Sequence, residues 1–239
     1  MAHDTTGTPV GRLATAEADD VDLTDDVDLT DEELAEAALA LTGFRHSTRW
    51  IFGTMLFSAT MSLIAAFVLS YDAIKLAENP LAALSCNVNT VISCGTVGLT
   101  WQASLFGFPN AFLGLITEPV VMTIAVAGLA GVRFPRWFMF TAQVIYLLGL
   151  IFAVWLFSQS MWVIGALCPW CLLITISTSL VFLTLLHYNV RENNLYLPPA
   201  AQARVQGWFR KDYDLYAGIA WVALLFVLIF IEHGSKLFG

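Results

Sequence analysis

Charged residues are scarce in this sequence, making up only 13% of its 239 residues, whereas 58% of the residues are hydrophobic. A soluble domain is usually about 25% charged, so this composition excludes an ordinary soluble globular protein. Basic residues are the scarcer sign, 11 against 19 acids, and nothing in the sequence indicates nucleic-acid binding. Twelve of the 19 acids precede residue 40, so the net charge of −8 describes an N-terminal tail.

Long apolar runs make up most of the remaining chain. A run of about 20 residues spans the hydrocarbon core of a bilayer as a helix. Five runs meet this requirement, and they cover approximately residues 50–70, 108–131, 137–157, 168–187 and 215–231. The sequence therefore predicts an all-α integral membrane protein, with a four-helix core over 45–190 and a fifth transmembrane helix within 214–239.

The segment 1–44 has a different character. Its first 30 residues are rich in Asp, Thr, Ala and Gly, and they contain too few large apolar side chains to offset the entropy of ordering. A capping box, with Thr30 as N-cap and Glu33 three residues later, precedes a run whose apolar residues share one helical face. We predict a disordered acidic tail with a short amphipathic helix near 31–41.

The distribution of basic residues predicts the orientation in the membrane. With a cytoplasmic N-terminus, nine Lys and Arg residues lie on the cytoplasmic side, four of them in the loop 191–213, and only Lys75 and Lys236 lie opposite. The same topology places the polar loop 71–107 and the start of the fourth span on the extracytoplasmic side of a cytoplasmic membrane. All four cysteines of the chain then lie on the side where disulfides form and persist.

Cys168 and Cys171 form a C-x-x-C pair at the predicted start of the fourth helix, after a predicted helix break at the polar residues Ser158-Gln159-Ser160. Residues i and i+3 share one face of the first turn, and the helix N-terminus favours a thiolate there. Pro169 suits the first turn, where its missing N–H costs nothing. A redox pair is the favoured interpretation, while a structural disulfide and half of a metal site are the alternatives. His46 and His187 lie at predicted cytoplasmic helix ends, away from the cysteines, which argues against zinc.

Cys86 and Cys94 lie in the polar loop with seven residues between them. The intervening segment is too polar to cross lipid and short enough to form a mobile hairpin or a partial helix. An inert loop staple is one interpretation of this pair. Because a second pair is expected on the same membrane face, an electron relay between the two pairs is the better interpretation.

The cysteine spacing and the sequence around it resemble the vitamin K epoxide reductase family, and most closely its bacterial homologues. Three features carry the resemblance, which covers about residues 48–188: the Cys86/Cys94 spacing, the Cys168/Cys171 pair, and the run between them, GTVGLTWQASLFGFPNAFLG. Many bacterial relatives carry a fused thioredoxin-like domain. None is recognised in this sequence, so a separate secreted or membrane-anchored thioredoxin-like thiol oxidase is the expected partner.

The resemblance implies a role for each cysteine. Cys86 and Cys94 match the pair that takes electrons from the thiol partner, and Cys94 is expected to form a transient bond with Cys168. Cys171 matches the sulfur that faces a membrane quinone, either menaquinone or ubiquinone. The implied function is a quinone-dependent thiol:disulfide oxidoreductase that supports disulfide formation in exported proteins, with no metal.

Two further positions follow from the same resemblance. Asn110 matches an asparagine that hydrogen-bonds a quinone carbonyl, and Thr100 lies near a Ser or Thr position of the family. Vitamin K enzymes of vertebrates place a tyrosine one turn after the second C-x-x-C cysteine, where this sequence has Thr175. This difference favours simple quinone reduction over reduction of vitamin K epoxide.

Glu118 lies near the middle of the second span, directly before Pro119. An acid inside a membrane is a functional candidate by default, here as a proton donor to the reduced quinone. The alternative is a neutral side chain that satisfies backbone carbonyls freed by the proline.

Two other functions are compatible with a membrane protein that has four cysteines. A transmembrane electron carrier would bring reducing equivalents outward, and it would need cysteines reachable from both faces. A non-catalytic membrane protein would use its disulfides as structural staples, and those bridges would not respond to quinone.

Overall fold

The computed structural model describes residues 43–89 and 91–237, which belong to the compact unit Leu39–Gly239. The predicted acidic tail with its helix near 31–41 lies outside the described residues. The described chain is helical, and its elements are η1 (Phe44–His46), α2 (Thr48–Glu78), α3 (Cys94–Gly98), η2 (Trp101–Ser104), α4 (Ala111–Leu129), α5 (Arg136–Ser158), η3 (Gln159–Ile164), α6 (Pro169–Arg191), α7 (Pro199–Arg210) and α8 (Tyr213–Leu237).

Five helical segments are long and apolar enough to cross a membrane: Thr48–Glu78, Ala111–Leu129, Arg136–Ile164, Pro169–Arg191 and Tyr213–Gly234. They correspond one to one with the five predicted spans. The prediction of an all-α, multi-pass membrane protein is therefore confirmed. No strand occurs in the described part of the chain, where the only β-type pairing is an isolated bridge.

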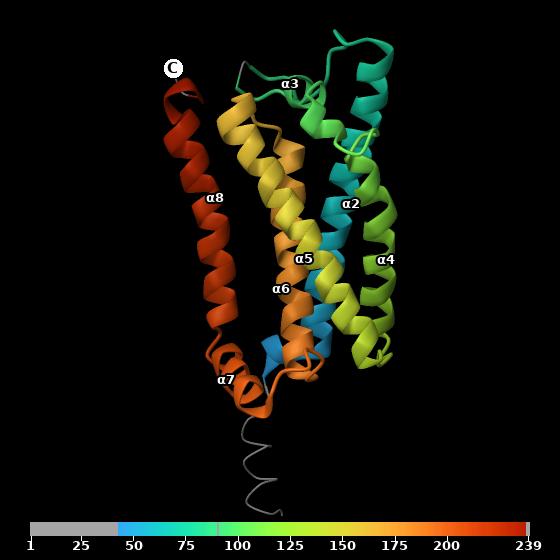
Figure 1. Ribbon diagram of the computed structural model, residues 1–239, viewed down its shortest axis with the longest axis vertical. Coiled ribbons are helices and arrows are strands. Elements are labelled where there is room, and N and C mark those ends of the chain that lie inside the picture. The colour runs from blue at the N-terminus through green and yellow to red at the C-terminus, as the bar shows by residue number, and fades with distance from the viewer. Residues whose placement is uncertain (1–42, 90, 238–239) are drawn as a thin grey trace, which may run out of the picture. The chain divides into compact units, whose positions relative to one another are not determined.

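The long helix α2 is the centre of the bundle, with α4 and α6 packed against it (Figure 1). Small side chains on its buried face, such as Ser58, Ala59 and Ala66, allow close approach of the neighbouring helices. A Cβ atom placed on Gly114 of α4 would lie 2.7 Å from the Cβ of Ala66. Helix α5 packs against α6, and α8 lies beside α6 on the outside of the bundle.

Helix α2 continues to Glu78, beyond the predicted end of the first span at residue 70. Nothing in residues 71–78 breaks a helix, and termination comes only at Asn79 and Pro80. The first part of the predicted loop 71–107 is therefore helical, and it carries Asp72 and Lys75 beyond the apolar stretch.

The predicted break at Ser158-Gln159-Ser160 is wrong, because the helix continues through it as the π-helical segment η3. Wider π turns occur mostly as single insertions inside α-helices, often near functional sites. The chain leaves η3 at Gly165, whose φ of 70° is the left-handed conformation that glycine adopts at little cost. This turn directs the chain into the short segment that ends at Cys168.

The basic segment 191–213, which was expected to be a loop, contains the amphipathic helix α7. Beyond it, α8 is tied to the core at the end opposite the cysteines. Arg45 forms ion pairs with Asp212 and Asp214. The ring of His187 joins Asp214 through Nδ1 at 2.8 Å and His46 through Nε2 at 2.8 Å.

Two further contacts fix α8 along its length. The indole Nε1 of Trp221 donates to Ser179 Oγ of α6 at 3.0 Å. Leu225 and Ile229 pack with Phe157 and Met161 in a buried apolar cluster. The fifth helix is therefore an integral part of the bundle.

Candidate thiol relay and the adjoining cavity

Cys168 is the N-cap residue of α6, and Pro169 occupies the first turn of that helix as predicted. The backbone N–H of Cys171 donates to the Cys168 sulfur at 3.2 Å. Both residues are free cysteines in this structure, Cys168 being buried and Cys171 partly exposed. The C-x-x-C pair is therefore present as a dithiol at a helix N-terminus, where a thiolate is stabilised.

Cys86 and Cys94 form a disulfide. The loop around it is held by side-chain hydrogen bonds to the backbone. Asn87 Oδ1 accepts from the N–H of Gly95 at 2.9 Å, and Ser93 Oγ accepts from the N–H of Thr96 at 3.1 Å as the N-cap of α3. The short helix α3 begins only at Cys94, and the described residues between the two cysteines, 87–89 and 91–93, are not helical.

A parallel β-bridge between Ile92 and Leu167 joins the loop to the segment that precedes α6. The N–H of Leu167 donates to Val91 O at 2.6 Å, and the N–H of Ser93 donates to Leu167 O at 3.0 Å. Cys94 follows Ile92 by two residues, and Cys168 follows Leu167 by one. The pairing therefore sets Cys94 beside Cys168.

The Cys168 sulfur lies 3.5 Å from the Cys94 sulfur. This is close to van der Waals contact, the separation from which a thiolate attacks a disulfide. Cys86, Cys94 and Cys168 are all buried, with exposed fractions of 6%, 3% and 3%. The loop disulfide and the helix-start dithiol thus form one continuous buried sulfur cluster.

The pKa of Cys168 is lowered, chiefly because the Cys171 thiol donates a hydrogen bond to its sulfur. The backbone N–H groups of Cys171 and Trp170 lower it further, whereas burial and the nearby Asp72 oppose the shift. A lowered pKa makes Cys168 both a ready nucleophile and a good leaving group in exchange with Cys94.

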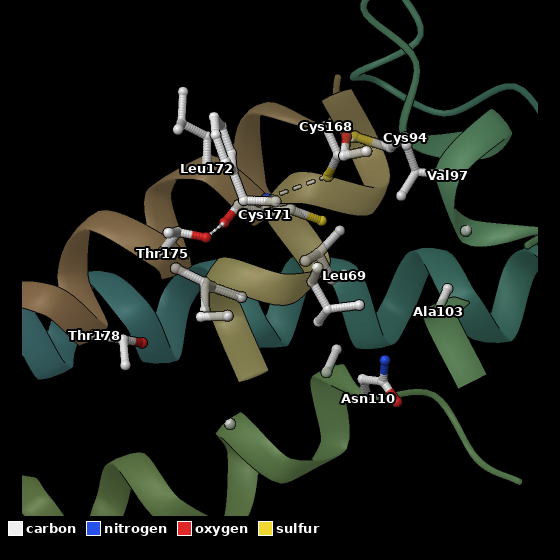
Figure 2. A pocket seen from close by; sticks show the side chains of 18 of the residues that line it. Leu69, Cys94, Val97, Ala103, Asn110, Cys168, Cys171, Leu172, Thr175 and Thr178 are labelled. Carbon is white, nitrogen blue, oxygen red and sulfur yellow. Dashed lines mark hydrogen bonds between the residues drawn. The ribbon is translucent and has the colours of Figure 1, made fainter. Parts of the chain in front are cut away.

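A cavity of about 510 Å³ adjoins the sulfur cluster, and its walls come from α2, α4, α5, α6 and α8. Cys94, Cys168 and Cys171 line one end of it, with Asn110 across the space from Cys171 (Figure 2). The volume falls within the range of cavities that hold a small organic ligand, and most of the lining is apolar. An apolar ring system with a few hydrogen-bonding oxygens suits such a site.

Asn110 precedes α4, and its side-chain amide is fixed by the backbone. Its Oδ1 accepts from the N–H of Leu105 at 3.2 Å, and its Nδ2 donates to Gln102 O at 2.6 Å. An amide nitrogen carries two hydrogens, so one N–H is left for a ligand oxygen. The predicted quinone-binding asparagine therefore lines the cavity in a fixed orientation.

Thr175 and Thr100 differ in their position relative to the cavity. Thr175 lines the cavity one turn after Cys171, and its hydroxyl donates to Cys171 O at 3.0 Å. The Thr100 hydroxyl donates to Val97 O at 2.7 Å, and Thr100 is not part of the cavity lining. A quinone contact from Thr100 remains a prediction.

Glu118 also lines the cavity, and its exposed fraction is 4%. Its carboxyl oxygens accept hydrogen bonds from Ser62 Oγ at 2.8 Å and Tyr146 Oη at 3.0 Å. Both partners are neutral hydroxyls on other helices, α2 and α5. The Glu118 carboxyl group is thus hydrogen-bonded to side chains of two neighbouring helices. These bonds are separate from the alternative role, in which the side chain satisfies backbone carbonyls freed by Pro119.

Asp72 is a site residue that sequence reasoning missed. It is buried on the polar end of α2, and one carboxyl oxygen lies 3.7 Å from the Cys86 sulfur. Asp72, Cys86 and Cys94 are also the one set of three potential metal ligands that converge within the described residues. In this structure two of the three are joined in a disulfide, and they offer no thiolate to a metal.

The fold and the site define a multi-pass membrane protein with two thiol pairs in contact, the class of membrane thiol oxidoreductases. Comparison with known families narrows this class. Residues 53–186, more than half of the chain, match the model of the vitamin K epoxide reductase family, and the chain belongs to that family. A separate comparison with curated proteins found no match. Family membership implies oxidoreductase activity, and helix α8 lies beyond the matched residues.

Proposed function

We propose that this protein passes electrons from a thioredoxin-like dithiol partner to a membrane quinone and so supports disulfide formation in exported proteins. The partner dithiol is oxidised to a disulfide, and the quinone gains two electrons and two protons to become a hydroquinone. Between them, electrons move by thiol–disulfide exchange through Cys86 and Cys94 to Cys168 and Cys171.

The observation that carries this proposal is the 3.5 Å contact between Cys168 and an intact Cys86–Cys94 disulfide. A structural staple needs no free thiol beside it. Here a sulfur with a lowered pKa adjoins the bridge, so exchange requires almost no movement of the reacting atoms. The exchange joins Cys94 to Cys168 and releases Cys86 in one direction, and it reverses in the other.

The cavity provides the second half of the reaction. Cys171 lines it directly, and a quinone ring placed there lies against the thiol that must reduce it. The free N–H of Asn110 would hydrogen-bond one quinone oxygen and stabilise the negative charge that develops during reduction. Menaquinone and ubiquinone both present such carbonyl oxygens.

Glu118 is proposed as the proton donor on the quinone side. A carboxyl inside a membrane with only hydroxyl partners is most stable in its neutral form, which has a proton to give. A hydroquinone needs a proton on each oxygen, and Glu118 would supply one of them. The carboxyl would then recover its proton through Tyr146 or Ser62.

The orientation of the protein follows from charge. The bundle end opposite the cysteines carries five arginines: Arg45 before α2, Arg49 in α2, Arg133 between α4 and α5, Arg136 at the start of α5, and Arg191 at the end of α6. We propose that this end is cytoplasmic, with the sulfur cluster on the extracytoplasmic face of the cytoplasmic membrane. A secreted or membrane-anchored partner would reach the cluster there.

The test is quinone reduction by the purified protein, with a reduced thioredoxin-fold protein as electron donor and a short-chain quinone as acceptor. Serine at any one of the four cysteines should abolish turnover, and Leu81→Ser, at an exposed loop position, should leave it unchanged. Full activity in the Cys171→Ser variant would overturn the proposal. In the Cys171→Ala variant, mass spectrometry should detect the Cys94–Cys168 disulfide, which a pair of inert staples would not form.

A further inference from the structure

The carboxyl group of Asp72 lies where a proton must move during the relay. One of its oxygens is 3.7 Å from the Cys86 sulfur, and Asp72 is buried with an exposed fraction of 6%. A disulfide sulfur has no hydrogen to donate, so this contact does not satisfy an ionised carboxylate. Burial without a donor is costly for a carboxylate, and a role that uses the carboxyl group accounts for its position.

In the described part of the chain, the one cation that acts on the carboxyl group does so at a distance, without a salt bridge. Lys75 is the nearest basic residue on the same helix, but its ammonium lies over the Tyr71 ring, 4.5 Å from the centroid. No ion pair joins Lys75 to Asp72 among the described residues. The other titratable groups near Asp72 are sulfurs: Cys86 and Cys94 in the loop, and Cys168 at the start of α6.

The relay creates a requirement for acid–base chemistry at Cys86 in particular. Cys168 has its own activation, because the thiol of Cys171 and two backbone N–H groups stabilise its thiolate. No comparable donor contacts the Cys86 sulfur in the described structure, and Asp72 is its one polar side-chain neighbour. When the loop disulfide opens, Cys86 departs as a thiolate in a buried site, and when it closes, the Cys86 thiol must lose its proton.

On these grounds we propose that Asp72 is the catalytic acid–base group of Cys86, an inference that rests on the proposed thiol relay. In the closing step, the Asp72 carboxylate takes the proton of the Cys86 thiol. The Cys86 sulfur then attacks Cys94 in the Cys94–Cys168 disulfide. The Cys86–Cys94 bond forms, the Cys94–Cys168 bond breaks, and Cys168 leaves as a thiolate.

The electron count of this step balances, because one disulfide replaces another and no external oxidant is needed. Its product is the arrangement in the structure, with Cys86 bridged to Cys94 and Cys168 free at 3.5 Å. In the opening step the protonated Asp72 carboxyl returns its proton to Cys86 as that sulfur departs. The same group thus acts as base in one direction and as acid in the other.

The exchange can be isolated from both the partner and the quinone. In a Cys171→Ala background, a single oxidation leaves one disulfide that interconverts between the Cys94–Cys168 and Cys86–Cys94 forms. A jump from about pH 5 to about pH 8 starts this relaxation, because the low pH suppresses the thiolate that carries exchange. Acid quenching, alkylation and mass spectrometry then give its rate.

Asp72→Asn should slow the relaxation roughly 100-fold or more, within the usual range for loss of a general acid–base group. Glu78→Gln is the matched control, because it removes a negative charge from an exposed position of the same helix and should relax like the parent. Asp72→Glu should restore part of the rate, and the rate should again depend on pH through the titration of a carboxyl group. A purely structural role of Asp72 would not produce this pH dependence.

Relaxation of Asp72→Asn within about threefold of the Glu78→Gln rate would overturn the proposal, since loss of acid–base catalysis must exceed that factor. So would failure of Asp72→Glu to regain rate if Asp72→Asn is slow but melts like the parent. Reduction of quinone by the full protein is a separate measurement. Its absence would refute the quinone-linked function, whereas an Asp72-dependent relaxation would still stand.

Discussion

The hydrogen bond from the Cys171 thiol makes a quantitative prediction about Cys168. This bond is the largest contribution to the lowered pKa of Cys168. A hydrogen bond to a charged group contributes about 1.5–3 kcal/mol, and one pKa unit corresponds to about 1.4 kcal/mol. Replacing Cys171 by alanine should therefore raise the Cys168 pKa and weaken its ionisation equilibrium by a factor of about 10 to 100.

The measurement uses protein in which Cys86 and Cys94 are replaced by serine, with and without Cys171→Ala. The rate of alkylation of Cys168 by iodoacetamide, followed by mass spectrometry across pH, gives the midpoint of its titration. Restricted access of the reagent to buried Cys168 lowers the rate by the same factor at every pH, so the midpoint still reports the pKa. At pH values below both midpoints, the thiolate fraction should be about 10- to 100-fold lower in the alanine variant.

A control with the opposite sign is available in the same cluster. The charge of Asp72 raises the Cys168 pKa, so Asp72→Asn should move the alkylation midpoint downward. An unchanged midpoint in the Cys171→Ala variant would refute the reasoning, because the thiolate would then owe its stability to the helix N-terminus alone. A downward shift in that variant would refute it as well.

Two further predictions concern the bundle that holds the site. Gly128→Ala places a Cβ about 2.5 Å from the buried Phe52 ring and should destabilise the protein by about 1–3 kcal/mol in thermal unfolding. The control is Gly53→Ala, which has no neighbour within 4 Å and should be neutral or stabilising. A stable Gly128→Ala protein would mean that α2 and α4 separate easily. Trp221→Phe removes the hydrogen bond to Ser179 between α8 and α6 and should lower the free energy of unfolding by about 0.6 kcal/mol. A double-mutant cycle with Ser179→Ala should show coupling of this size, and no coupling would contradict the contact.

The transmembrane helices were predictable because each needs only a long apolar run, and five such runs are visible in the sequence. Helix ends were less predictable where polar residues continue a helix. Asp72 and Lys75 were assigned to a loop, although nothing before Asn79 terminates α2. The polar residues at 158–160 indicated a break, although η3 continues the helix with a wider turn.

The positions of the cysteines relative to one another were predictable only in part. Spacing and charge placed both pairs on one face of the membrane, and the family resemblance paired Cys94 with Cys168. The bridge between Ile92 and Leu167 was not predictable, because main-chain hydrogen bonds leave no side-chain pattern in a sequence. Asp72 was missed for a related reason, since 14 residues separate it from the sulfur that it contacts.

The burial of the loop disulfide has a consequence for selectivity. Small thiols in the surrounding solution meet a bridge with less than a tenth of either cysteine exposed, and their attack is therefore slow. A protein partner that binds the loop can use its binding energy to displace the cover and expose the bridge. In the proposed relay, the energy needed to open the loop would therefore select the electron donor. Reductants that cannot open the loop would be kept from the quinone pool.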